Sequence, residues 1–150
     1  MAVIVEVNER NVAEAGFVHA MSWQASHAHF CSAAFVKRHT QEAQTEYLRR
    51  EIEAGKRIFM RIEEKPVGVV SVWGDLIENL YVLPTEQNRG YGASLLRFAV
   101  QLCRGTPKLW ILSNNEGARR FYIRHGFRET GKVKPLKGEL HELEMELATL

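Results

Sequence analysis

The most informative segment of this sequence is Leu80-Tyr81-Val82-Leu83-Pro84-Thr85-Glu86-Gln87-Asn88-Arg89-Gly90-Tyr91-Gly92. It reads as an apolar strand that stops at Pro84, a short loop, and two glycines where a helix begins. Backbone N–H groups at the start of a helix lack partners within the helix and bind anions. Glycines let a phosphate approach the backbone closely, and Arg89 adds a positive charge. The segment therefore predicts a binding site for a diphosphate.

Taken alone, the two glycines are explained at least as well by a tight turn. The segment is not a Walker loop, because no Gly-Lys-Ser/Thr follows it, and it lacks the third glycine of the dinucleotide fingerprint. A second segment is needed to decide between the turn and the diphosphate site.

That second segment is Leu109-Trp110-Ile111-Leu112-Ser113-Asn114-Asn115-Glu116-Gly117-Ala118-Arg119-Arg120-Phe121-Tyr122, with Gly126-Phe127 following. It runs from a β-rich stretch into a helix. Its simplest interpretation is a capped helix, with Asn114 or Asn115 as the cap and Tyr122 as a half-buried aromatic side chain.

The rest of the chain predicts a single domain, residues 1–150, with mixed secondary structure. Asn11 and Glu14 resemble a capping box at the start of the first helix, Thr40 is a candidate N-cap, and Gly55 is a candidate stop. The sequence order β-α-α-β-β-β-α-β-α-β-β predicts an α+β fold with a mixed sheet, antiparallel first and with a later parallel crossover. We expect strands at 2–7, 57–63, 67–73, 77–83, 108–112 and 140–147, and helices at about 11–23, 41–54, 91–104 and 116–125.

The two segments together resemble the GCN5-related N-acetyltransferase (GNAT) superfamily, in particular its small bacterial members. Gln87-x-x-Gly90-x-Gly92 matches the pyrophosphate loop of that superfamily, and Asn115 to Phe127 matches its second conserved block. The resemblance covers residues 80–127, and the agreement of the strand order before and after them extends it over the whole chain. It implies a twisted mixed sheet flanked by helices, with the cofactor in a V-shaped splay between the strands that end near Val82 and Ser113.

The resemblance also implies an activity: transfer of an acetyl group from acetyl-CoA to an amine in a ternary complex, without a covalent enzyme intermediate. The backbone of Leu80, Tyr81 and Val82 would pair with the pantetheine arm, and Asn115 would contact the CoA arm. Tyr122 would protonate the departing thiolate, as a phenol with a pKa near ~10 can do for a thiol near ~8.5. The loop residues that would hold the pyrophosphate are Gln87, Asn88, Arg89, Gly90, Tyr91, Gly92 and Ala93.

The general base is less clearly marked. Several family members carry a glutamate at the position of Leu76, where this sequence departs from the pattern. Glu78 is our candidate because it would lie on the same strand face, but an exposed structural carboxylate or deprotonation through water remains open. Trp23, His27, His29, Phe30 and Trp73 could line an acceptor pocket, although a core or surface position explains each of these residues better.

The amino-acid composition limits the kinds of partner that we expect for this protein. The 150 residues are 45% hydrophobic and 25% charged, with a net charge of +2, which is typical of a soluble globular domain. No run approaches the roughly 18 apolar residues of a membrane span, and no export signal is visible, so we expect a cytoplasmic protein without a membrane partner. Cys31 and Cys103 fit no paired metal or redox spacing, and His27, His29 and Cys31 lack a second ligand pair, so no metal is expected.

The region 119–138 is strongly basic, which suits an anionic ligand or a solvated helix face, but no interleaved aromatic residues point to nucleic acid. The acceptor is predicted to be a small-molecule amine, since no extra docking domain is present. A protein or peptide acceptor, or a non-catalytic acyl-CoA-binding module, are the alternatives. The resemblance makes a homodimer possible.

Overall fold

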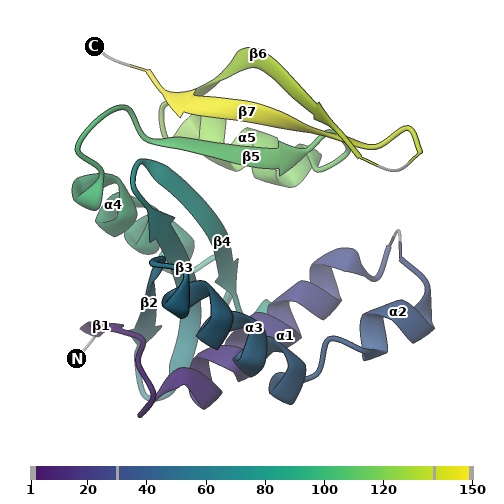
Figure 1. The fold of residues 1–150 in the computed structure, drawn as a ribbon. Coiled ribbons are helices and arrows are strands. Elements are labelled where there is room, and N and C mark those ends of the chain that lie inside the picture. The colour runs from purple at the N-terminus through teal and green to yellow at the C-terminus, as the bar shows by residue number, and fades with distance from the viewer. Residues whose placement is uncertain (1–2, 30, 137, 149–150) are drawn as a thin grey trace.

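The computed structural model describes residues 3–29, 31–136 and 138–148 (Figure 1). The strands are β1 Val3–Glu6, β2 Arg57–Ile62, β3 Pro66–Trp73, β4 Leu76–Val82, β5 Lys108–Leu112, β6 Phe127–Pro135 and β7 His141–Leu147. The helices are α1 Val12–His27, α2 Ala33–Lys37, α3 Gln41–Glu53, α4 Tyr91–Leu102 and α5 Glu116–Arg124, with a 3₁₀ turn η1 at Pro84–Glu86. The predicted element order is confirmed except that three helices, not two, lie between β1 and β2. The short helix α2 was not predicted, and Ala2, the first residue of the expected N-terminal strand, lies outside the described residues.

The strands form one mixed sheet in the order β1-β2-β3-β4-β5-β7-β6. Neighbouring strands are antiparallel except β4 and β5, which are parallel and are connected through α4. This arrangement confirms the predicted α+β fold and its late parallel crossover. Figure 1 shows the strands β5, β6 and β7 standing apart from β2, β3 and β4 beyond the point where the two groups meet.

Alternating side chains of the sheet pack against two separate layers of helices. On one face, Phe59 of β2 and Ile77 of β4 belong to a buried cluster with Leu95, Leu96 and Ala99 of α4. On the other face, Ile58 and Met60 of β2 pack with residues of α1 and α3. A strand exposes successive side chains to opposite faces, so β2 can serve both layers at once.

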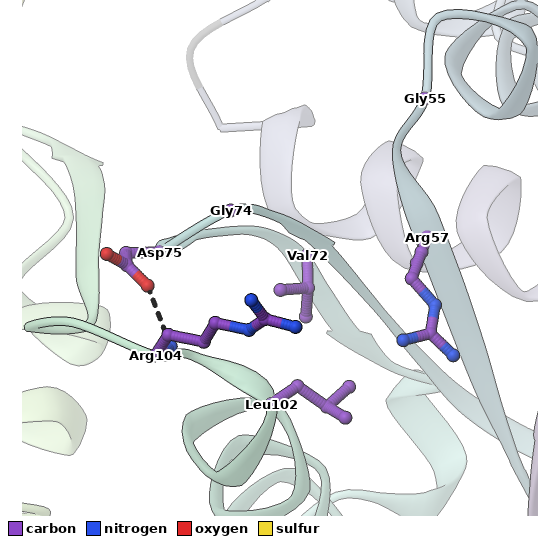
Figure 2. Close-up of a pocket in the computed structure, with 7 residues that line it drawn as sticks. All are labelled: Gly55, Arg57, Val72, Gly74, Asp75, Leu102 and Arg104. Atoms are coloured by element: carbon purple, nitrogen blue, oxygen red, sulfur yellow. Dashed lines mark hydrogen bonds between the residues drawn. The ribbon is translucent and has the colours of Figure 1, made fainter.

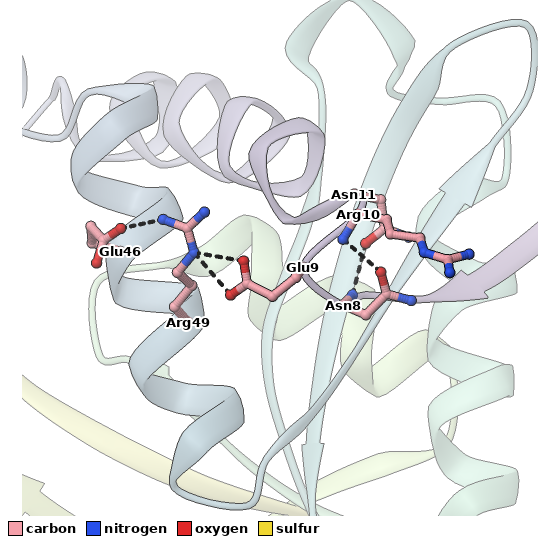
Figure 3. Close-up of polar contacts among 6 residues, drawn as sticks. All are labelled: Asn8, Glu9, Arg10, Asn11, Glu46 and Arg49. Atoms are coloured by element: carbon pink, nitrogen blue, oxygen red, sulfur yellow. Dashed lines mark hydrogen bonds and ion pairs between the residues drawn. The ribbon is translucent and has the colours of Figure 1, made fainter.

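The start of α1 differs from its predicted cap. The helix begins at Val12, directly after Asn11, but the Asn11 side chain makes no capping hydrogen bond to the helix. Its Oδ1 instead accepts a hydrogen bond from the backbone N–H of Asn8 at 2.8 Å, which closes the turn before the helix (Figure 3). The predicted capping box is therefore wrong in mechanism, because the turn competes for the asparagine side chain.

The start of α3 matches its prediction. Thr40 accepts a hydrogen bond from the backbone N–H of Ala43 at 3.1 Å, and Gly55 follows the helix with φ at 102°. Arg49 of α3 forms ion pairs with Glu9 before α1 and with Glu46 of its own helix, as Figure 3 shows. The ion pair with Glu9 joins α3 to the segment before α1.

Candidate active site

The site begins where β4 and β5 separate. The two strands form a register pair at Leu76 and Lys108 and then diverge. A bulge in β4 adds to the divergence: Val69 of β3 lies opposite Tyr81 and Ser71 lies opposite Glu78, and Asn79 between them has φ at 52°. A bulge bends its strand and increases its twist. The β5-facing edge of Leu80–Val82 is thus left available to an extended ligand, as the predicted splay requires.

The loop after β4 directs backbone donors toward the same place. Asn88 and Gly90 both have positive φ, at 65° and 84°, and Gly90 is the N-cap of α4. The first bond within the helix runs from the N–H of Ser94 to the carbonyl of Gly90 at 3.0 Å. The N–H groups of residues 91–93 precede that bond and point out of the helix end, where the helix dipole also favours an anion.

Different structural features explain the two glycines of the loop. Gly90 adopts a backbone conformation that side chains disfavour, so a turn alone explains it. Gly92 lies inside α4 with an ordinary φ, and a Cβ added there would meet Phe121 at 3.6 Å and Val82 at 3.7 Å, which is normal contact distance. Internal packing therefore does not require Gly92. Close approach of a ligand to the backbone does explain it, and the tight-turn interpretation does not.

Helix α5 brings the other predicted residues to the opposite side. Asn115 caps the helix by accepting a hydrogen bond from the N–H of Ala118 at 3.1 Å. Tyr122 packs edge-on against Phe121 and Phe127. Burial raises the pKa of the Tyr122 phenol above its usual range, and the neighbouring Tyr81 adds to the effect. Burial also raises the pKa of Tyr81, to about 12. Both phenols keep their protons at neutral pH.

A cleft of about 880 Å³ joins these elements. All but two of the predicted site residues line it, namely Leu80, Tyr81, Val82, Gln87, Asn88, Gly90, Tyr91, Gly92, Ala93, Asn115 and Tyr122. The cleft thus combines bare backbone donors at one end with a half-buried phenol that retains its proton. That combination suits a phosphate-bearing ligand whose other end takes part in acid–base chemistry.

Two predicted residues do not line the cleft. Arg89 lies 3.3 Å from the carboxylate of Glu86. Glu78 Oε1 lies 2.9 Å from Lys56 Nζ, which also contacts Glu51 at 2.7 Å. Burial alone would lower the pKa of Lys56, but its hydrogen bonds and charge pairing with Glu51 and Glu78 outweigh this and raise it. The structure therefore places the Glu78 carboxylate in an ion pair, and its role as general base stays a prediction.

Of the candidate residues for an acceptor pocket, only some lie at the cleft. His29 lines the cleft, but Trp23 is stacked between His27 and His39, with ring centroids 3.9 and 3.5 Å away. Trp73 is exposed and lies 5.2 Å from Lys56 Nζ. Phe30 lies outside the described residues.

Sequence reasoning missed one wall of the cleft. Ser22, Ala25 and Ser26 of α1 line it together with His29. Ser22, Ala25 and Ser26 are spaced by three and four residues and so share one helix face, which is the signal that could have found them, and His29 follows just after the helix ends.

A second hollow, of about 360 Å³, lies at the end of β3 and the start of β4 (Figure 2). Arg57 and Arg104 line it, but Arg57 is paired with Glu6 at 2.9 Å. Asp75 accepts hydrogen bonds from the backbone N–H groups of Arg104 and Gly105, both at 3.0 Å. These contacts fix the turn between α4 and β5, so we assign this hollow a structural role.

Within residues 3–29, 31–136 and 138–148, no group of three or more histidine, cysteine, aspartate or glutamate side chains is placed to hold a metal ion. The helices formed by the described residues are all too short or too polar to cross a bilayer.

The family model of the acetyltransferase (GNAT) domain matches residues 54–129. This match spans just over half of the chain and includes the loop, α4 and α5. The chain therefore belongs to the GNAT acetyltransferase family. The comparison with curated proteins found no match.

Solved structures share the fold over almost the full length. YjaB from Escherichia coli, solved in its apo form, is 22% identical, with a TM-score of 0.72 over 100% of this chain and 99% of that one. PaiA N-acetyltransferase from Thermoplasma acidophilum, in complex with coenzyme A, is 17% identical, with a TM-score of 0.69 over 96% and 98% of the two chains. YncA from Salmonella typhimurium, with acetyl-CoA, is 18% identical, with a TM-score of 0.69 over 98% and 93%.

Proposed function

We propose that this protein transfers the acetyl group of acetyl-CoA to a primary amine of a small molecule, by direct attack in a ternary complex. The observation that carries the proposal is Gly92. Gly92 leaves the backbone in the first turn of α4 without a side chain, although neither packing nor backbone conformation requires a glycine there. This turn lines the same cleft as Tyr122. Two structural neighbours with coenzyme A or acetyl-CoA bound support this choice of co-substrate.

The cleft residues then have separate roles in the proposed reaction. The N–H groups of residues 91–93 hold the diphosphate, and the free edge of Leu80–Val82 aligns the pantetheine arm, so that the thioester is fixed beside the amine. The amine nitrogen attacks the carbonyl carbon, and a backbone N–H of the bulged strand can stabilise the oxyanion. The C–S bond then breaks with its electron pair on sulfur, and Tyr122 supplies the proton that makes the thiol.

The Tyr122 phenol fits this role because burial keeps it protonated until charge develops on the sulfur beside it. No cysteine of the described residues lines the cleft, and this agrees with direct attack rather than an acetyl-enzyme intermediate. Glu78 remains our sequence-based candidate for removal of the amine proton, although Lys56 occupies its carboxylate.

Thiol release from acetyl-CoA tests the proposal. The wild-type protein is assayed against separate pools of polyamines, amino acids, aminoglycosides and short peptides, with acetyl-CoA binding measured by calorimetry in parallel. Turnover with a small-molecule pool supports the proposal. Turnover with peptides alone indicates a protein acceptor. Binding of acetyl-CoA without turnover in any pool indicates a non-catalytic module.

A further inference from the structure

Helix α1 carries two buried polar side chains, His19 and Ser22, near the cleft. His19 and Ser22 lie three residues apart on one helix face, 2% and 4% exposed. Among the described residues, neither ring nitrogen of His19 nor Oγ of Ser22 has a hydrogen-bond partner. A buried polar group without a partner destabilises the folded state, so two of them on one helix face call for an explanation.

Ser22 lies at the wall of the cleft, and His19 lies behind that wall. Ser22 lines the cleft directly. The His19 ring meets the Tyr81 ring edge-on, with centroids 5.0 Å apart, and Tyr81 also lines the cleft. Tyr81 in turn is close enough to Tyr122 to influence its pKa. His19 thus contacts a cleft residue, Tyr81, that lies near the proposed general acid.

The surroundings of His19 keep its imidazole neutral. Burial lowers the pKa of His19 to about 4, and the charges of His39 and His27 add to the decrease. Asn79 of β4 and Glu51 of α3 oppose it, and the neutral phenol of Tyr47 on α3 lies 5.6 Å away between ring centroids. A neutral imidazole offers one N–H donor and one nitrogen lone pair, so the His19 ring can both donate and accept a proton, and the side chain of Asn79 interacts with it.

We propose that His19 and Ser22 form the proton-accepting side of the acceptor site: Ser22 orients the attacking amine, and His19 takes the amine proton through a water that it shares with Ser22. This assignment rests on the proposed acetyltransferase function. It fits the same cleft better than Glu78, because Ser22 lines the cleft, whereas Glu78 does not line it and its carboxylate forms an ion pair with Lys56.

Every proton that moves in the proposed reaction has a donor and an acceptor. As the C–N bond forms, the nitrogen becomes far more acidic than the free ammonium, so a weakly basic imidazole can accept its proton. The electron pair of the C–S bond leaves with sulfur, which takes the Tyr122 proton. The imidazolium of His19 then returns one proton to the Tyr122 phenolate through water in the cleft, and both residues regain their starting states.

His19→Leu, His19→Gln and Ser22→Ala test the assignment, with Thr45→Val as a matched control. Thr45 is also buried, at 7% exposed, but its hydroxyl is satisfied by the carbonyl of Gln41 at 2.7 Å and it does not line the cleft. All variants are measured for kcat with the amine that turns over fastest, for acetyl-CoA affinity by calorimetry, and for Tm.

We expect His19→Leu and His19→Gln to lower kcat by about 10²-fold or more, the range of general-base effects, with acetyl-CoA affinity unchanged. Ser22→Ala should raise KM for the amine and lower kcat. His19→Leu should also raise Tm by about 2 °C or more, because it removes an unsatisfied polar group. Thr45→Val should lower Tm and leave kcat unchanged. A loss of kcat together with a gain in Tm is not what a purely structural histidine would show.

A His19→Ala variant adds a signature of proton transfer, since added imidazole should restore part of its kcat. A wild-type kcat in His19→Leu and His19→Gln, or losses of kcat, Tm and acetyl-CoA affinity together in both, would overturn the assignment. A wild-type protein that turns over no amine overturns the proposed function instead, and the His19 role falls with it.

Discussion

Leu76 of β4 lies opposite Lys108 of β5, and this register pair is where the parallel strands are held together before they diverge. Asp75 supports the junction from both sides. Its carbonyl accepts a hydrogen bond from the N–H of Lys108 at 2.8 Å, and its carboxylate accepts two from the turn at Arg104 and Gly105. The geometry of the cleft therefore depends on a small set of contacts at its vertex.

Removal of the Asp75 carboxylate should loosen this vertex. Asp75→Ala deprives two backbone N–H groups of their acceptor, so we expect a loss of about 1–3 kcal/mol in the free energy of unfolding, measured in urea. Asp75→Asn is the control, because its amide oxygen can still accept both bonds. Equal stability of the alanine variant and the wild type would contradict the proposed role of the carboxylate.

Gly92→Ala should separate folding from co-substrate binding. Alanine is the better helix former, and its Cβ has room beside Phe121, so we expect the variant to gain about 0.5–1 kcal/mol in stability. Its methyl group covers the backbone that the diphosphate approaches, so acetyl-CoA affinity should fall at least about tenfold in calorimetry, and Gly92→Val should lose more.

Gly90→Ala is the matched comparison for Gly92→Ala. With φ at 84°, Gly90 cannot accept a side chain without strain, and we expect a loss of about 1 kcal/mol in stability. Unchanged acetyl-CoA affinity in Gly92→Ala and Gly92→Val would remove the argument for a diphosphate at this helix end.

Tyr122→Phe should retain acetyl-CoA affinity and lose rate. The ring packing against Phe121 and Phe127 is kept, but the proton for the departing thiolate is lost. General acids contribute about 10²- to 10⁴-fold, so we expect a fall of that order in kcat in the thiol-release assay. A rate within twofold of the wild type would mean that water or another group protonates the sulfur.

The sequence predicted the loop, the second conserved segment and the strand order, because each depends on local signals. The positive φ at Gly90 is typical of glycine. The helix N-caps at Asn115 and Thr40 are likewise typical of asparagine and threonine. The Asn11 cap was wrong because Asn8, three residues away, competes for the same side chain. Local spacing does not reveal such competition.

The rest of the site depends on tertiary contacts that no local pattern encodes. The ion pair between Lys56 and Glu78 joins residues that are distant in sequence, so the sequence left the carboxylate looking free. The lack of partners around His19 is likewise a property of the packed α1, α3 and β4 elements. A histidine on a helix is otherwise unremarkable in a sequence.

Glu78→Gln should distinguish an ion-pair role from a catalytic one. Because the carboxylate pairs with Lys56 at a partly exposed site, we expect a loss of about 1 kcal/mol in stability and a kcat within about threefold of the wild type. A fall in kcat of about 10² or more without loss of stability would restore Glu78 as the general base and count against His19.

The low pKa of His19 predicts an acid-dependent loss of stability. Histidine in an unfolded chain titrates near ~6.5, whereas His19 in the folded protein titrates at about 4. Between these values the unfolded chain binds more protons than the folded one, so the free energy of unfolding falls as the pH falls from 6.5 to 4. A difference of about 1.5 pK units at pH 5 corresponds to about 2 kcal/mol.

Urea denaturation of the wild type and His19→Leu at pH 7 and pH 5 measures this contribution. Other groups, such as the Glu6 carboxyl whose pKa Arg57 lowers, also titrate in this range, but they are common to both proteins and cancel in the difference. The stability gain of His19→Leu over the wild type should therefore be larger at pH 5 than at pH 7, by about 2 kcal/mol. An equal gain at both pH values would show that His19 is protonated in the folded state as readily as in the unfolded chain. In that case it could not be the neutral, unpaired imidazole from which a proton-accepting role follows.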